Sequence, residues 1–200
     1  QRSGERAVVV RARARERKGV VEAAVLLEAW QAYRGDAWRV IVPRPPDRFQ
    51  TAFSLAQQHG FKVQKRSDNQ PVAADKQVWI GDSMGELFGY YLAADIAFVG
   101  GSLVDTGCQN IIEPIACGVP TLFGPSIYNF VAACRGALEA GAARQVFSAE
   151  EWQHAVAEWL AHPADCAHYA QKAQAFISQH QGASARMADK IVEAVAADSR

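Results

Sequence analysis

The sequence lacks an excess of charge of either sign. Its 21 basic and 21 acidic residues cancel across 200 residues, so the formal net charge is zero. Without a net field, the chain has no long-range attraction for nucleic acid or for an anionic membrane surface. We therefore predict no nucleic-acid partner.

Cysteine is scarce and follows no ligand pattern. The four cysteines show no CxxC spacing and no zinc-ligand pattern with histidine, which argues against a zinc site and against a disulfide framework; they are Cys108, Cys117, Cys134 and Cys166. We predict no metal, no cofactor and a reduced, cytosolic chain.

Long apolar runs are also missing. No stretch approaches the roughly 20 residues that a membrane-spanning helix needs, and no signal peptide opens the chain. Because the sequence starts at Gln1 rather than at methionine, we expect a fragment of a larger protein. Half of the residues are hydrophobic, enough for one domain over residues 1–200.

Common catalytic motifs are absent as well. The sequence contains no GxSxG elbow, no GxxxxGK[ST] loop, no HExxH helix and no GxGxxG fingerprint. The histidines all fall on expected helices or their ends, where a surface position is the simpler interpretation: His59, His154, His162, His168 and His180. We predict no catalytic residue within this chain.

Strands that alternate with helices dominate what is present. Apolar strands are expected at residues 7–10, 38–42, 61–65, 78–80, 97–99, 121–123 and 143–147. Helices are expected at residues 20–33, 47–58, 83–94, 110–118, 129–140, 148–159, 164–181 and 184–197. This order predicts an α/β fold, a Rossmann-like doubly wound parallel sheet with helices on both faces.

A basic run, residues 11–18, follows the first apolar segment. Its alternating Arg and Ala are compatible with an edge strand protected by charge or with a disordered lead-in; a patch that faces phosphate or lipid headgroups is the alternative. In the next helix, the apolar face is expected at Val21, Val25, Leu26 and Trp30.

The candidate site centres on residues 95–130. Asn110 followed by Glu113 has the form of a capping box, and Gly118 suits the C-terminal cap of a helix of about two turns. The N-terminus of that helix faces a glycine-containing loop, which predicts an anion or phosphate site.

Two other segments carry candidate ligand groups. Arg44 follows a strand, where its guanidinium suits either a phosphate or a surface carboxylate. Ser83 and Glu86 form a second capping box, so Glu86 and Glu113 are each either a cap partner or a ligand contact. A third box, Ser148 with Glu151, predicts only a helix start.

Five motifs in order resemble the C-terminal half of bacterial 3-deoxy-D-manno-octulosonic acid (Kdo) transferases. They are Pro43-Arg44-x-Pro46-x-Arg48-Phe49, Gly81-Asp82-Ser83-Met84-Gly85-Glu86-Leu87, Phe98-Val99-Gly100-Gly101-Ser102-Leu103, Gly107-x-Gln109-Asn110-x-x-Glu113 and Gly124-Pro125-x-x-x-Asn129-Phe130. The resemblance implies one half of a GT-B glycosyltransferase, which moves Kdo from CMP-Kdo to a lipid A precursor (lipid IVA) in lipopolysaccharide synthesis. It also implies peripheral or anchored association with the cytoplasmic face of the inner membrane, without a metal.

The resemblance also implies a CMP site. It assigns the contacts to a Pro-Arg pair, a Met-Gly-Glu turn and an Asn-x-x-Glu turn, which here are Pro43, Arg44, Met84, Gly85, Glu86, Asn110, Ile111, Ile112 and Glu113. The catalytic glutamate and the acceptor site of the family belong to an N-terminal half that this chain lacks, so the chain alone is expected to bind nucleotide without turnover.

Departures from the family pattern leave alternatives open. Residues 12–19 replace a common Ser-Thr-x-x-Gly-Glu-Glu turn, Pro45 and Gln109 replace frequent histidines, and Cys108 replaces a frequent glycine. The rival enzyme hypothesis is another GT-B protein that uses a UDP-sugar, either a transferase or a 2-epimerase. The non-enzymatic hypothesis is a nucleotide-binding module that has lost catalysis.

Overall fold

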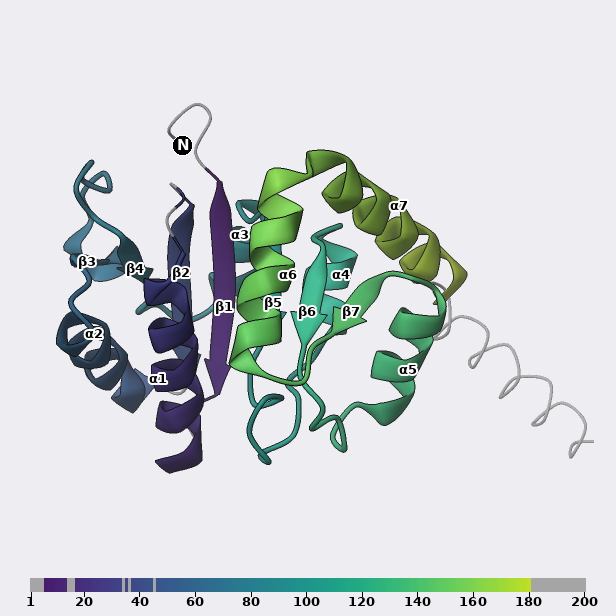
Figure 1. Cartoon of the computed structure of the whole chain (residues 1–200), viewed down its shortest axis with the longest axis horizontal. Coiled ribbons are helices and arrows are strands. Elements are labelled where there is room, and N and C mark those ends of the chain that lie inside the picture. Colours follow the sequence, from purple (N-terminus) through teal and green to yellow (C-terminus); the bar gives the residue numbers. More distant parts are fainter. Residues whose placement is uncertain (1–5, 14–16, 34, 36, 45, 181–200) are drawn as a thin grey trace, which may run out of the picture.

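The fold is built on a seven-stranded parallel sheet in the order β3-β4-β2-β1-β5-β6-β7 (Figure 1). The computed structural model describes residues 6–13, 17–33, 35, 37–44 and 46–180. The strands are β1 (Ala7–Arg13), β2 (Trp38–Arg44), β3 (Val63–Lys65), β4 (Val78–Ile80), β5 (Ile96–Val99), β6 (Thr121–Phe123) and β7 (Ala143–Gln145). The α-helices are α1 (Arg17–Gln31), α2 (Phe49–Gln58), α3 (Leu87–Leu92), α4 (Ile112–Ala116), α5 (Val131–Glu139), α6 (Ala149–Ala161) and α7 (Pro163–His180).

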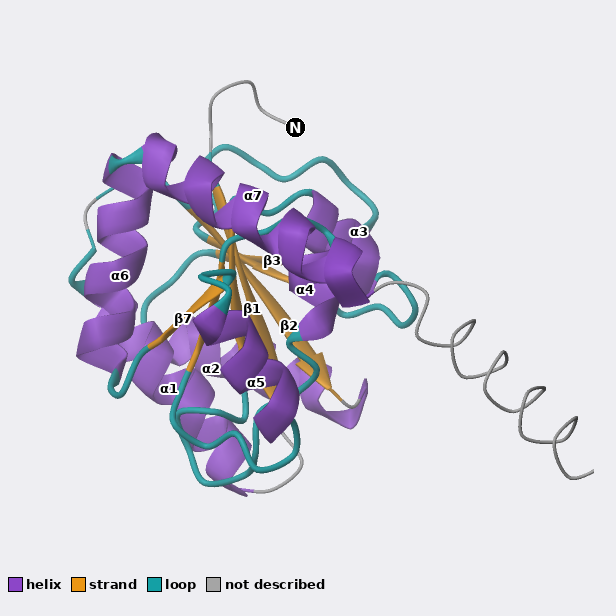
Figure 2. Cartoon of the chain, turned by 90° about the vertical axis from the view of Figure 1, so that its right-hand side faces the viewer, coloured by secondary structure: helices purple, strands orange, loops and turns teal. Residues whose placement is uncertain are grey.

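Successive strand residues pack against opposite layers of helices, as the pleat of a sheet requires. Val8 and Val10 join a core with side chains of α1, α2 and α6, whereas Val9 joins the cluster of Tyr90 and Tyr91 from α3. Helices α1 and α6 cover one face, and α3 and α4 cover the other (Figure 2). The predicted α/β doubly wound parallel sheet is confirmed.

The sheet consists of two parts that are each continuous in sequence. Strands β1 to β4 come first along the chain and β5 to β7 follow, and among the described strands the two parts pair only through β1 and β5. At the amino end of this pair, the Ala7 N–H donates to Asp95 Oδ2 at 2.7 Å. The strand order reverses here, and in open α/β sheets ligands bind outside the carboxyl ends of the strands at such a switch point.

The predicted edge position of the basic run is wrong. Its first residues belong to β1, which lies in the middle of the sheet and pairs with β2 over residues 7–13 and with β5 over residues 8–11. The apolar start of the strand, Val8 to Val10, is buried on both faces, as suits a central strand of a parallel sheet. Residues 14–16 and the side chains of 11–13 lie outside the description.

Helix α1 also presents a different face from the one expected. Leu26 and Trp30 are buried, but Val21 and Val25 are 51% and 40% exposed. Glu22 is buried in their place, at 1% exposure. At the other end of the chain, α7 matches the predicted helix at residues 164–181, and the predicted helix at 184–197 lies outside the described residues.

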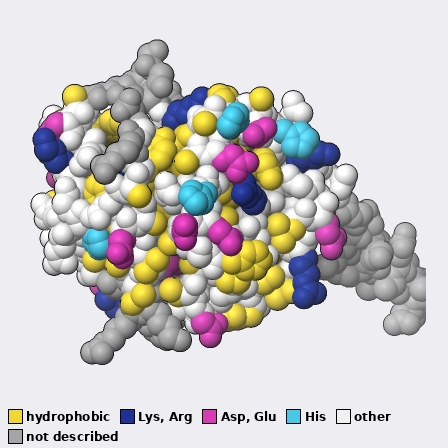
Figure 3. All heavy atoms as spheres, viewed as in Figure 1, with side chains coloured by type: hydrophobic (Ala, Val, Ile, Leu, Met, Phe, Trp, Pro, Cys, Tyr) yellow, Lys and Arg dark blue, Asp and Glu magenta, His cyan; other side chains and the backbone are white. Residues whose placement is uncertain are grey.

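The surface carries no marked separation of charge on the face drawn in Figure 3, where basic, acidic and histidine side chains are interspersed among apolar ones. Within the described part of the chain, no helix has the length and apolarity needed to cross a membrane. The same residues contain no group of three or more His, Cys, Asp or Glu side chains arranged for a metal ion.

Candidate nucleotide site

The predicted site residues come together at the carboxyl edge of the sheet, on three neighbouring connections. Arg44 ends β2, the turn at residues 82–86 follows β4, and the loop before α4 follows β5. Strands β4 and β2 are adjacent, and only β1 separates β2 from β5. From β4 to β5 there are three strand spacings, about 14 Å in all, a span that a nucleotide can bridge.

Arg44 is exposed and Pro43 is buried beside it. Both residues still pair with β1, at Arg13 and Ala12, so the rigid sheet fixes the backbone of Arg44. Of the two alternatives for Arg44, the surface carboxylate is not observed: no carboxylate of a described residue lies within 4.0 Å of its guanidinium. The guanidinium is therefore available to an anionic ligand.

The turn after β4 differs from its prediction. The expected capping box at Ser83 is wrong: helix α3 begins only at Leu87, and its cap residue is Glu86. Gly85 has φ +81°, a left-handed conformation that cannot belong to a right-handed helix, so the chain stays in a turn through this residue. Met84 is 63% exposed at the tip of that turn.

The carboxylate of Glu86 is held by three neighbours. Ser83 Oγ donates to Glu86 Oε2 at 2.5 Å, Arg66 Nη2 pairs with Glu86 Oε1 at 3.1 Å, and Tyr90 Oη donates to Glu86 Oε2 at 3.4 Å. The Ser83 hydrogen bond, and behind it Arg66, hold the pKa of Glu86 below its usual range. The side chain thus fixes the turn, and the backbone at Met84 and Gly85 remains open to a ligand.

The predicted capping box at Asn110 is wrong, because the cap residue of α4 is Ile111 and has no side-chain cap bond. Asn110 Oδ1 instead accepts from the Ile112 N–H at 3.1 Å, which fixes the loop just before the helix. The helix itself has only five residues, because the stretch before Ile112 is not helical. A helix this short has a weaker dipole than the two turns predicted.

The predicted residues on this loop divide into two kinds. Ile111 is fully buried in a cluster with Ile115 and Phe123, and Ile112 packs against that cluster. Their side chains hold α4 in place and only their backbone could meet a ligand. Asn110 and Glu113 are partly exposed at the same end of the helix.

An open groove of about 510 Å³ lies beside this loop. Its walls come from the turns after β5 and β6 and from α5, and they include Asp105, Tyr128 and Arg135. Tyr128 is 59% exposed. The groove offers an aromatic ring and charges of both signs next to the candidate nucleotide site.

Comparisons with known proteins agree with this architecture. The chain is 36% identical over 172 residues to the 3-deoxy-D-manno-octulosonic acid transferase of Bordetella pertussis, which covers 86% of the chain and 40% of that protein. It superposes with a TM-score of 0.81 and 28% identity on the C-terminal CMP-Kdo binding domain of WaaA from Acinetobacter baumannii, over 88% of this chain and 90% of that one. The chain is a C-terminal domain of the Kdo transferase family.

More distant relatives of this Kdo transferase domain share the fold alone. WaaG, a glycosyltransferase involved in lipopolysaccharide biosynthesis, matches with a TM-score of 0.57 at 15% identity, over 86% of this chain and 42% of that one. The seven-stranded parallel sheet thus matches GT-B glycosyltransferases. No family model matches the sequence.

Sequence reasoning missed three residues of this Kdo transferase domain. Arg66 belongs to none of the predicted motifs, but its Nη2 donates to Glu86 Oε1. Gln109 is 8% exposed, and its Nε2 is buried without a hydrogen-bond partner. Glu22 is buried against the turn after β5. For Glu22 the sequence offers one signal: the residue lies at helical spacing from Leu26 and Trp30, on the face of the helix that was expected to be buried.

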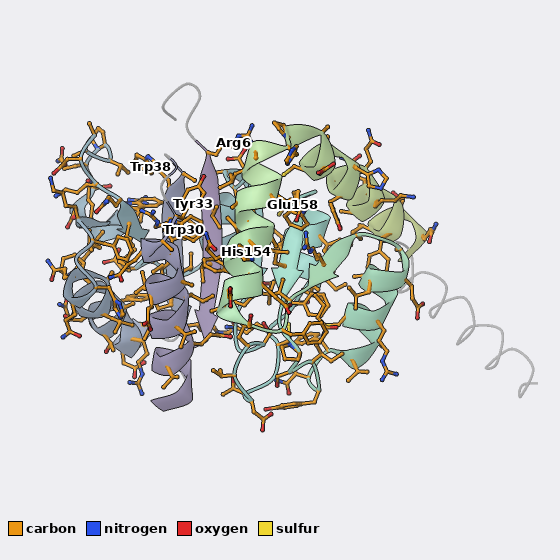
Figure 4. The ribbon with its side chains drawn as sticks, viewed as in Figure 1. Arg6, Trp30, Tyr33, Trp38, His154 and Glu158 are labelled. Atoms are coloured by element: carbon orange, nitrogen blue, oxygen red, sulfur yellow. The ribbon has the colours of Figure 1, made fainter. Side chains whose placement is uncertain are left out.

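The histidines occupy the positions predicted for them. His59 and His162 follow the last residues of α2 and α6, and His168 lies on α7. His154 and Glu158, labelled in Figure 4, lie on the exposed side of α6, and Glu158 pairs with Arg144 at 2.8 Å. These side chains belong to helices rather than to the loops that carry the candidate site.

Proposed function

We propose that this chain is the donor-binding half of an enzyme that transfers Kdo from CMP-Kdo to a lipid A precursor. The observation that carries the proposal is the similarity to a CMP-Kdo binding domain over nine-tenths of that domain's length, at 28% identity. The chain spans about 40% of the Bordetella transferase, so the acceptor site and the catalytic base are assigned to a preceding half. Association of the whole protein with the inner membrane is part of the same proposal.

Arg44 is assigned to the phosphate of CMP. Its exposed guanidinium can donate two parallel hydrogen bonds to phosphate oxygens, and these are stronger than neutral ones because both partners are charged. As Kdo leaves, negative charge grows on that phosphate, so a fixed cation there lowers the barrier. Pairing of β2 with β1 supports this role because it fixes the arginine backbone.

Glu113 and the turn at residues 84–86 are assigned to the nucleoside. A carboxylate accepts hydrogen bonds and donates none, so Glu113 suits the two ribose hydroxyls. The exposed backbone at Met84 and Gly85 suits the edge of the cytosine base, since the Glu86 side chain is already held by Ser83 and Arg66. Asn110, Ile111 and Ile112 shape the start of α4 between these contacts.

A titration of the 200-residue chain tests the proposal. CMP, UMP and UDP are added in turn while backbone amide shifts are followed by NMR. CMP is expected to bind in preference and to move the amides of Arg44, Gly85 and Asn110. Preference for UDP would favour the rival hypothesis of a UDP-sugar transferase or 2-epimerase, and no response to any nucleotide would contradict donor binding by this chain.

The Arg44→Ala variant tests the phosphate contact. Loss of a charge-assisted contact worth about 1.5–3 kcal/mol should weaken CMP binding about 10- to 100-fold while the domain stays folded. Arg144→Ala is the matched control, because that arginine pairs with Glu158 on the surface of another part of the molecule. Equal CMP affinity in the two variants would exclude the phosphate role.

Transfer activity is expected only when both halves are present. The chain alone should bind CMP without transferring Kdo, whereas a protein with a restored N-terminal half should transfer it. A restored protein that binds CMP-Kdo but transfers nothing would favour the third hypothesis, a binding module that has lost catalysis.

A further inference from the structure

Glu22 is a buried carboxylate that meets three consecutive backbone N–H groups. Its Oε2 accepts from the Gly101 N–H at 2.6 Å, and its Oε1 accepts from Ser102 at 3.0 Å and from Leu103 at 2.9 Å. The residue is only 1% exposed. Convergent backbone N–H groups of this kind make an anion-binding concavity, and here a side chain from α1 fills it.

This contact crosses the junction between the two parts of the sheet. Helix α1 follows β1, and the turn at residues 101–103 follows β5. Strands β1 and β5 are neighbours in the sheet, so the carboxylate joins their connections directly at the carboxyl edge. Arg44 and the turn at 82–86 lie on one side of the junction, and Asn110 and Glu113 lie on the other.

Ser102 extends the contact to the turn after β6. Its Oγ donates to the Val99 carbonyl at 2.6 Å and accepts from the Gly124 N–H at 2.7 Å, while its carbonyl accepts from the Ser126 N–H at 2.9 Å. A Cβ on Gly124 would lie 2.4 Å from the Ser102 carbonyl oxygen, so glycine alone permits this approach. The two turns therefore hold each other in one arrangement.

Ser126 continues the network to the loop before α4. Its carbonyl accepts from the Cys108 N–H at 2.7 Å, and its Oγ accepts from the Gly107 N–H at 3.1 Å. The next amide, that of Gln109, donates to the Gly100 carbonyl at 3.2 Å. A series of hydrogen bonds therefore leads from Glu22 to residues 107–109, and Asn110 is the next residue along the chain.

We infer that Glu22 is a positioning residue for the nucleotide site: it fixes the turn at residues 101–103 and, through Ser102 and Ser126, the loop that carries Asn110 and Glu113. The inference rests on the proposed function. It also means that the three N–H groups of that turn are not available to the donor phosphate, which leaves Arg44 as its principal partner.

The Glu22→Gln variant tests this role with little change in volume. An amide has one acceptor oxygen where the carboxylate has two, and its NH₂ group cannot accept from a backbone N–H. We expect the amides of residues 101–103 to shift in the absence of ligand, and CMP affinity to fall about tenfold or more because charged hydrogen bonds are lost. Glu28→Gln, on the exposed side of the same helix, is the matched control and should bind CMP as the wild type does.

Affinity is measured by NMR well below the melting temperature of each variant, so that a loss of global stability alone does not change it. Ser102→Ala is the second variant, and it serves if Glu22→Gln does not fold: it removes the bonds to Val99 and Gly124 and leaves Glu22 in place. It should weaken CMP binding in the same direction. If each variant of this pair that folds binds CMP with wild-type affinity, the inference is overturned and the proposed function is not. If the wild-type chain itself binds no CMP, the proposed function is overturned, and the inference with it.

Discussion

The two buried charged side chains Arg39, on β2, and Glu22, on α1, are held in different ways. Glu22 is held by hydrogen bonds, whereas Arg39 lies between aromatic rings. Its guanidinium lies 5.0 Å from the ring centroids of both Trp30 and Phe61, but its only hydrogen bond to a described residue, the Gln77 carbonyl, is 3.5 Å long. Burial lowers the pKa of Arg39 to about 10. The side chain therefore acts mainly by packing between two aromatic rings.

Replacement of Arg39 should show that packing matters more than charge. Arg39→Met fills the same space without a buried charge, so the free energy of unfolding should change by about 1 kcal/mol or less. Arg39→Ala leaves the rings unsupported and should cost on the order of 2 kcal/mol. Urea denaturation measures both values, and an equal loss in the two variants would instead assign the stabilisation to the charge.

Because the pKa of Glu86 is lowered in the folded protein, the free energy of unfolding should fall when the pH becomes acidic. The pKa of Glu86 in the folded protein lies below the ordinary 4.5, through Ser83 first and then Arg66. The stabilisation is therefore complete above about pH 4.5 and is lost as the pH falls through the lower folded value. The difference in melting temperature between wild type and Glu86→Gln should be constant near neutral pH and should shrink in acid. A difference that persists unchanged to about pH 3 would contradict this.

Among the elements, α6 has the best-defined start. Ser148 Oγ accepts from the Glu151 N–H at 3.1 Å, and Glu151 Oε2 accepts from the Phe147 N–H at 2.8 Å, so the predicted cap at Ser148 is confirmed. Ser148→Ala should lower the free energy of unfolding by about 1 kcal/mol, whereas Ser148→Asp retains an acceptor and should lose little. Thermal denaturation of the two variants measures these losses of stability. Equal losses in Ser148→Ala and Ser148→Asp would mean that the capping hydrogen bond is not what stabilises the start of α6.

The sequence predicts elements well where the signal is local. Apolar β5 and the Ser148 cap depend on adjacent residues, and both are where the sequence puts them. The start of α3 was predicted too early because the conformation of Gly85 outweighs the Ser83 pattern. The carboxyl edge was predictable because parallel strands bring their ends together, so Arg44 and Asn110 could be assigned to one region before any coordinates.

Contacts between distant segments were beyond the sequence. Glu22 meets residues 101–103 far along the chain, and a single glutamate in an amphipathic helix is normally a surface residue. Central placement of β1 depends on pairing with β5, which no neighbouring residue encodes. Arg66 and Glu86 likewise meet only after β3 and β4 have paired.

For the whole molecule, the balance of charge predicts how it behaves in solution. With a sequence pI near 7.1, the chain has almost no net charge at neutral pH to keep copies apart. Exposed apolar side chains at Met84, Phe88 and Leu92 add to the tendency to associate. Light scattering should therefore show self-association strongest near pH 7 and weaker at about pH 8.5. Association that is equally strong at both values would argue against this explanation.

The junction between β1 and β5 also bears on the order in which the molecule assembles. Strands β1 to β4 can pair as soon as residues 7–80 are available, but Val8 must wait for Ile96, and closing so long a loop costs more entropy than any local pairing. On a growing polypeptide, the first part of the sheet is complete before β5 has been synthesised. Glu22 loses its hydration only when the turn after β5 arrives, so the nucleotide site, which draws residues from both parts of the sheet, cannot form until the second part has been synthesised.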